Sequence, residues 1–203
     1  WNTLSNGDRF GSLLFNQHSH QEMKPSNNRR NCMRLLNRIV ENYQQVLHQT
    51  FAPIKESNKE QPEGSNNNQF SDTLKRLKYL AKPGTLIHVI SDFNHFDETS
   101  QGHLSKISQH TDIHCILVND PIESELPPAG LYGRSDGVKT GLLNTQQESL
   151  REHYRAAFEQ KLEKIKDFAL SHRGIFTSID TNYQQHSIGH QVNTRSTPHQ
   201  RGS

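Results

Sequence analysis

Two nearly continuous apolar segments constrain the fold of this chain more than any other feature. They span Thr85–Ile90 and Ile113–Val118, and a short helix is predicted between them around Leu104 and Ile107. Strands that are apolar along their whole length are typical of parallel sheets with both faces covered by helices. The pattern therefore predicts an α/β domain in which these two strands are parallel neighbours.

The flanking segments predict further helices and shorter strands. Arg9–Phe15 and His18–Met23 predict a hairpin at a sheet edge, because the second segment is polar and runs into Pro25. Thr145 to Glu148 fits a capping box, in which the Thr hydroxyl and the Glu carboxylate bind free amides at a helix start. The remaining predicted elements are helices over 31–51, 70–80 and 150–174, a β-ribbon or loop over 131–143, and a last strand over 175–179.

The length and composition predict one domain with solvated extensions. The chain has 203 residues, of which 31% are hydrophobic, and this is enough for one modest core. Residues 53–69 are rich in turn formers and predict a flexible loop, and residues 184–203 predict a disordered polar tail. We therefore assign one domain to residues 1–183.

Charge and hydropathy exclude several classes of protein. The net charge is +2 with acidic and basic residues interleaved, so charge gives no indication of nucleic-acid binding. No apolar run approaches the length of a membrane span. Cys32 and Cys115 have no paired spacing, which favours a reducing compartment, and we expect a cytoplasmic protein.

Acidic residues follow both apolar segments and are the first candidates for a site. Asp92 ends one strand, and Asp120 follows the other with Glu123 nearby. Because ligands of open α/β sheets bind beyond the carboxyl ends of the strands, these carboxylates could hold a hard divalent cation. Capping of the following loops explains the same residues without a ligand, and both interpretations stay open at this stage.

Common enzyme motifs are missing from the sequence. There is no GxSxG elbow, no GxxxxGK phosphate loop, no GxGxxG turn and no HExxH. The thirteen histidines are scattered, and His88 and His114 would meet on neighbouring strands, where hydrogen bonding in the core is sufficient explanation.

Three stretches together resemble the bacterial domain of unknown function 58 family. They are NGDRFGSLLFN, LKRLKYLAKPGTLIHVISDFNHFD and ILVNDPIESELPPAG, which lie in that order at 6–16, 74–97 and 116–130. The following REHYRAAF, at 151–158, also fits the long helix of that family.

The resemblance implies a von Willebrand factor A-like three-layer sandwich, with a mostly parallel sheet and one antiparallel edge strand. It also implies that the first strand is absent from this chain, which would be truncated at its N-terminus. The metal-ion-dependent adhesion site of such domains would place Asp92 as its last ligand. Its Thr position falls near Asn68, and its Asp-x-Ser-x-Ser loop would precede Trp1. A lone Asp92 cannot hold Mg²⁺ strongly, so we expect Mg²⁺, if any, as a cofactor only of the full-length protein.

The resemblance further implies a non-enzymatic interaction module that works with a MoxR-type AAA+ ATPase in assembling or activating other proteins. The alternative is a metal-assisted hydrolase that uses Asp92, Asp97, Asp120 and Glu123. A third possibility is a structural fragment that binds partners through the helix over 145–172, although its apolar stripe is expected to pack on the sheet. Direct pairing of the second and fourth strands, homodimerisation, or recruitment of loop or tail residues would compensate for the missing strand. From charge and hydropathy we expect neither nucleic acid nor a membrane as a partner.

Overall fold

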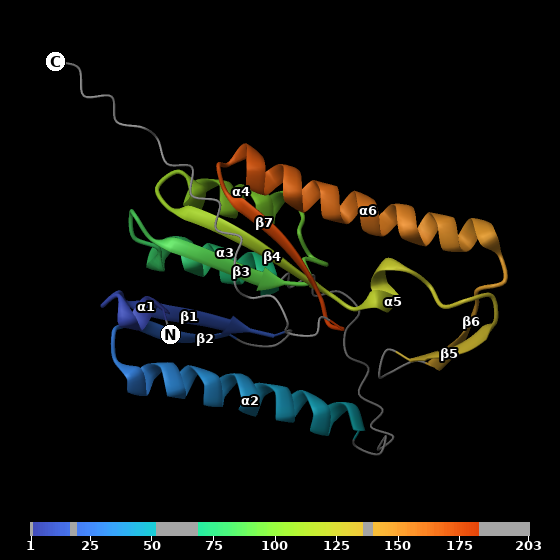
Figure 1. The fold of residues 1–203 in the computed structure, drawn as a ribbon, viewed down its shortest axis with the longest axis horizontal. Coiled ribbons are helices and arrows are strands. Elements are labelled where there is room, and N and C mark those ends of the chain that lie inside the picture. Colours follow the sequence, from blue (N-terminus) through green and yellow to red (C-terminus); the bar gives the residue numbers. More distant parts are fainter. Residues whose placement is uncertain (1, 17–19, 52–68, 136–139, 183–203) are drawn as a thin grey trace.

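The computed structural model describes residues 2–16, 20–51, 69–135 and 140–182 (Figure 1). The helices are α1 Asn2–Ser5, α2 Arg29–Phe51, α3 Gln69–Leu80, α4 Glu98–Ser108, α5 Pro121–Ser124 and α6 Glu148–Ser171. The strands are β1 Phe10–Phe15, β2 His20–Ser26, β3 Leu86–Ser91, β4 Asp112–Asn119, β5 Leu131–Ser135, β6 Thr140–Asn144 and β7 Ile175–Asp180. Apart from Gln69, which begins α3, the predicted loop at 53–69 and the predicted tail at 184–203 lie outside the described residues.

A three-stranded parallel sheet with the order β3-β4-β7 forms the centre of the domain (Figure 1). Ile87 pairs with Ile113 and Ile90 with Ile116, so the two apolar segments are parallel neighbours as predicted. β7 pairs with the other edge of β4, with Cys115 opposite Phe176. Because all three strands run in one direction, their carboxyl ends meet at a single edge of the sheet.

One face of this sheet packs against α3, α4 and α6. Side chains alternate along β3, where Ile87 and Val89 are buried while Leu86 and Ile90 are exposed. The core cluster consists of Phe70, Leu74, Ile87, Val89, Phe93, Phe96, Leu104, Ile107, Ile113, Cys115, Leu117, Ile165, Phe168 and Ala169. The predicted packing of the apolar stripe of α6 on the sheet is therefore confirmed.

The opposite face of the sheet is exposed among the described residues. Leu86 and Ile90 on β3, and Ile175 and Ile179 on β7, are between 38% and 61% exposed. We call the surface formed by the outward residues of β3, β4 and β7 the open face. The described helices cover one face of the sheet only, so the mixed α/β class is shown and the three-layer sandwich is not confirmed.

The β1–β2 hairpin forms a separate two-stranded antiparallel sheet, as do β5 and β6. Phe15 contacts Phe70 of α3, with 5.7 Å between ring centroids, and Glu22 forms a 2.7 Å ion pair with Arg76 of α3. The hairpin is thus held by side chains on α3 and not by backbone pairing with β3. Among the described residues β1 pairs only with β2, so direct pairing of the second and fourth strands across a missing first strand is not observed.

Helix α6 begins differently from the prediction. Its N-cap is Gln147, which makes no side-chain capping bond, so the predicted capping box at Thr145–Glu148 is wrong. Thr145 is fully buried, and its hydroxyl accepts from Gly130 N–H at 3.0 Å and donates to Pro128 C=O at 2.8 Å. The Thr side chain therefore fixes the preceding loop, because a tertiary contact outweighs the local capping preference.

The end of α6 depends on a close approach of backbone at Gly174. The N–H of Gly174 donates to Ala169 C=O at 2.8 Å, and Arg173 takes a left-handed φ of 58°. A Cβ on Gly174 would lie 2.6 Å from the carbonyl oxygen of Ile113, closer than such contacts are tolerated. Glycine is therefore required for β7 to enter the sheet directly after the helix.

Helix α2 lies at the edge of the molecule beyond the β1–β2 hairpin (Figure 1). The helix covers the predicted range 31–51 and begins two residues earlier. Much of its apolar stripe is nevertheless solvent-exposed, including Ile39, Val40 and Tyr43. None of the described helices is both long enough and apolar enough to cross a bilayer.

Candidate functional site

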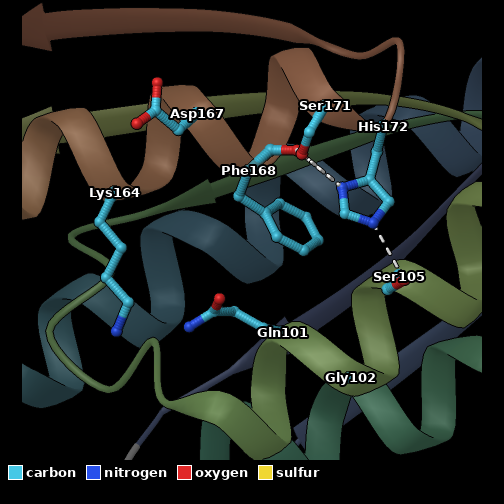
Figure 2. A pocket seen from close by; sticks show the side chains of 8 residues that line it. All are labelled: Gln101, Gly102, Ser105, Lys164, Asp167, Phe168, Ser171 and His172. Carbon is cyan, nitrogen blue, oxygen red and sulfur yellow. Dashed lines mark hydrogen bonds between the residues drawn. The ribbon is translucent and has the colours of Figure 1, made fainter.

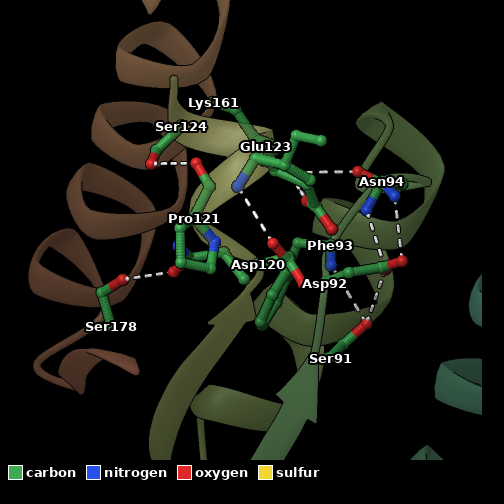
Figure 3. Close-up of polar contacts among 12 residues, drawn as sticks. Ser91, Asp92, Phe93, Asn94, Asp120, Pro121, Glu123, Ser124, Lys161 and Ser178 are labelled. Carbon is green, nitrogen blue, oxygen red and sulfur yellow. Dashed lines mark hydrogen bonds and ion pairs between the residues drawn. The ribbon is translucent and has the colours of Figure 1, made fainter. Parts of the chain in front are cut away.

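The loop that follows β3 is organised by Asp92 (Figure 3). Its Oδ1 accepts the backbone N–H of Asn94 at 3.1 Å, and its Oδ2 accepts the side-chain amide of Asn94 at 2.9 Å. The Ser91 hydroxyl accepts the N–H of Phe93 at 3.1 Å and donates to Asp92 Oδ1 at 3.4 Å. Asp92 is exposed, and both of its oxygens are already engaged in shaping this tight turn.

Phe93 anchors the same loop in the hydrophobic core. Its backbone is left-handed, with φ at 53°, and its side chain is only 2% exposed. The ring meets Phe70 and Phe96 in edge-to-face contacts, at centroid distances of 5.7 and 5.4 Å. A left-handed backbone costs roughly 1–2 kcal/mol for a residue with a Cβ. Burial of a Phe side chain contributes about 1.5–3 kcal/mol, so the buried ring holds the loop in its strained conformation.

The other predicted acids cap short segments of helix. Asp97 accepts the N–H of Ser100 at 2.7 Å at the start of α4, and Asp120 accepts the N–H of Ile122 at 3.0 Å at the start of α5. The capping interpretation of the sequence is therefore correct for Asp120, and Asp97 caps α4 in the same way. Carboxylates in these positions satisfy amide groups that have no partner within the helix.

Lys161 of α6 joins the two loops (Figure 3). Its Nζ donates to Asn94 Oδ1 at 3.1 Å and lies 3.5 Å from Glu123 Oε2. The Lys161 and Glu123 side chains are 23% and 36% exposed, so solvent screens this ion pair only partly. Nearby, burial first and Glu123 second raise the pKa of Tyr154. We call the surface formed by residues 91–94, 120–124 and Lys161 the strand-end rim.

The strand-end rim brings the predicted acids to one edge of the sheet but not to one point. Asp92 directly follows β3 and Asp120 directly follows β4. Because these strands are parallel neighbours, both residues lie at the same edge of the sheet (Figure 3). Glu123 is linked to Asp92 only through Lys161 and Asn94. Within the described parts of the chain, no three His, Cys, Asp or Glu side chains gather closely enough to hold a metal ion.

Sequence reasoning missed Asn94 and Lys161. These two residues are 67 positions apart, and they meet because α6 crosses the ends of the strands. Asn94 carried a local signal, since an Asp side chain typically accepts the backbone N–H two residues further on in a tight turn. Lys161 carried none, because it is one of several basic residues along the polar side of α6.

A pocket of about 570 Å³ lies between α4 and α6 (Figure 2). Its lining residues are Gln101, Gly102, Ser105, Lys164, Asp167, Phe168, Ser171 and His172. Nε2 of His172 is 2.9 Å from the Ser105 hydroxyl, and Nδ1 is 2.8 Å from Phe168 C=O. This is the spacing of a nucleophile and its base. Ser105, however, lies inside α4, where backbone amides are used within the helix and leave no oxyanion hole.

Comparisons with known proteins place the chain in a family without indicating an activity. The family model described as "Protein of unknown function DUF58" matches residues 1–164. Among curated proteins, none matches the chain.

Two solved structures resemble the fold at low identity. One is described as the crystal structure of conserved hypothetical protein BatB from Bacteroides thetaiotaomicron, with 13% identity over 88% of this chain and 75% of the other, and a TM-score of 0.48. The second is an aerotolerance-related membrane protein from Bacteroides fragilis NCTC 9343, with multiple mutations to serines. It shares 14% identity over 88% of this chain and 77% of the other, with a TM-score of 0.45. At these scores the likeness supports no inference about function.

Proposed function

This chain belongs to the DUF58 family of proteins of unknown function, and from that premise we propose that it is a non-enzymatic protein-interaction module. We further propose that its partner is a MoxR-type AAA+ ATPase, with which it assembles or activates other proteins. The family resemblance of the sequence motifs suggests this partner. The strand-end rim is the surface we assign to the interaction.

The observation that carries the proposal is the Lys161 bridge across the strand-end rim. It holds the loops after β3 and β4 in one arrangement on a rigid sheet, with contacts of 3.1 Å to Asn94 and 3.5 Å to Glu123. A surface that is ordered before binding loses less conformational entropy when a partner docks. Ile122 lies on this surface and is 55% exposed, which offers an apolar anchor among polar groups.

The same geometry gives no support to a metal-assisted hydrolase. Such an enzyme needs carboxylates that converge on an ion or a water. Asp97 and Asp120 instead cap α4 and α5, and Glu123 pairs with Lys161. Asp92, Asp120 and Glu123 shape the surface of the strand-end rim, and this supports our proposal that the rim serves recognition.

The described residues do not make a magnesium site by themselves. Mg²⁺ is held in near-octahedral geometry by several oxygens, and Asp92 offers one carboxylate whose two oxygens already accept bonds from Asn94. The predicted Thr position near Asn68 lies outside the described residues. Asp92 as a metal ligand stays a prediction, and we assign no step of the function to an ion. We place the module in the cytoplasm, in keeping with its free cysteines Cys32 and Cys115.

Direct binding to a MoxR-type ATPase from the same organism tests the proposal. The ATPase is immobilised, and binding of the wild-type protein is compared with that of Ile122→Glu. Leu170→Glu is the matched control, because Leu170 is a 58% exposed apolar residue on α6 away from the rim. We expect Ile122→Glu to weaken binding at least tenfold, about 1.4 kcal/mol, and Leu170→Glu to bind like wild type. Absence of wild-type binding, or equal weakening by both variants, would refute the proposal.

A further inference from the structure

Two histidines meet on the open face of the sheet, at a different place from the strand-end rim. His88 of β3 and His114 of β4 are direct partners in the parallel register. Their Nδ1 atoms are 3.2 Å apart, and their ring centroids are 5.2 Å apart. The two rings are tilted by 58° to one another. Neighbouring strands therefore present two imidazole nitrogens to one point on an exposed surface.

The distance between the two nitrogens is close to the distance between two nitrogen ligands of one metal ion. Imidazole binds Zn²⁺ at about 2.0–2.1 Å in tetrahedral geometry, which places two ligand nitrogens about 3.3–3.4 Å apart. The observed 3.2 Å between His88 Nδ1 and His114 Nδ1 needs only a small ring rotation to reach this value. An N–H···N hydrogen bond has a similar length, so the ring tautomers decide between the two arrangements.

The Thr177 hydroxyl can hold His114 in the tautomer that binds metals through Nδ1. Nε2 of His114 lies 2.8 Å from the Thr177 hydroxyl on the adjacent strand β7. When this hydroxyl accepts Nε2–H, the proton is held on Nε2, and the Nδ1 lone pair of His114 points toward His88. Metal-binding histidines usually have such a partner for their other nitrogen.

We propose that His88 and His114 chelate a transition-metal ion of the Zn²⁺ or Cu²⁺ class through their Nδ1 atoms. Imidazole suits these ions, whereas Mg²⁺ prefers oxygen. No third His, Cys, Asp or Glu completes the site among the described residues, so the remaining positions take water or a group from outside. The order of metal affinity is Cu²⁺ above Zn²⁺, with no detectable binding of Mg²⁺ at this pair.

Calorimetric titration of the full chain with ZnCl₂ and CuCl₂, after EDTA treatment and desalting, tests the proposal. The other histidines are accounted for by comparing His88→Ala and His114→Ala with His153→Ala, since His153 is an exposed histidine on α6. We expect each of the first two variants to lose one binding event or to weaken it at least tenfold, and His153→Ala to retain it. MgCl₂ is the negative control.

A second measurement uses the wild-type protein and does not depend on variant folding. In ¹⁵N-histidine NMR spectra, ZnCl₂ should shift Nδ1 of both His88 and His114. The proton that His88 Nδ1 donates in the metal-free contact moves to its Nε2, so that signal should shift as well. Thr177→Val should weaken Zn²⁺ binding about 10–100-fold, and Thr177→Ser should keep it. Unchanged Nδ1 signals, or a His88→Ala/His114→Ala protein that binds as many ions as wild type with equal affinity, would show a simple hydrogen bond and overturn the proposal.

Discussion

Replacing Phe93 by Ala and by Gly tests whether the loop at the strand-end rim is strained. Phe93 is 2% exposed and has a left-handed φ of 53°. Either substitution removes the buried ring and its contacts with Phe70 and Phe96, which costs about 3–5 kcal/mol. The informative quantity is the difference between the two variants, because the ring is lost in both.

At an ordinary buried position, Gly is worse than Ala by about 0.5–1 kcal/mol, because Gly has more freedom in the unfolded chain. At φ near 53° the order should reverse. Ala retains the left-handed penalty of roughly 1–2 kcal/mol, and Gly does not. After subtracting the unfolded-state term, Phe93→Gly should be more stable than Phe93→Ala by about 0.5–1 kcal/mol.

Phe96 supplies the matched control. It is a 5% exposed aromatic residue three positions along the chain, and its φ is not positive. Phe96→Gly should be less stable than Phe96→Ala, so the two positions should differ by about 1–2 kcal/mol with opposite signs. Urea unfolding followed by circular dichroism measures the free energies, with similar m-values required in all four variants. If Gly is the less stable residue at both positions, the loop stores no strain.

Two further predictions concern polar groups away from this loop. Thr145→Val should cost about 2–3 kcal/mol in urea unfolding, because Gly130 N–H and Pro128 C=O lose a buried partner. Thr145→Ser should cost about 1 kcal/mol for its lost methyl, and equal costs would contradict this role of the hydroxyl. Acidification should destabilise the protein partly through His114. Its pKa is lowered from 6.5 on folding, so the unfolded chain binds the proton first, and this contribution is lost as the pH falls below 6.5. With EDTA present, His114→Asn should have a flatter stability curve between about pH 7 and 5 than His153→Asn, and identical curves would exclude this linkage.

The parallel core could be predicted from the sequence because its signal is local and strong. Apolar runs at Thr85–Ile90 and Ile113–Val118, separated by enough residues for a helix, have few other solutions. The cap at Asp120 could also be predicted as one of two options, since Asp120 precedes a free helix start. In each case the predictive signal lies within one short segment of the chain.

The features that the sequence did not predict correctly depend on contacts between residues that are far apart in the chain. The capping box at Thr145 had the right local pattern, but the hydroxyl is used by Pro128 and Gly130, about fifteen residues away in the chain. The periodicity of α2 indicated a helix correctly, but it did not reveal that Ile39 and Tyr43 would remain exposed. The Lys161 bridge required the path of α6 over the rim, which no local pattern encodes.

The backbone contact at Gly174 couples the C-terminal end of α6 to the position of Lys161 in the strand-end rim. Lys161 lies thirteen residues before Gly174, about 20 Å along the helix axis. A side chain at 174 would push against the Ile113 carbonyl and tilt the helix about its end. A tilt of about 5° there would move Lys161 by about 2 Å, enough to separate it from Asn94. A mutation at the far end of the helix would then loosen the rim without altering a single residue in it.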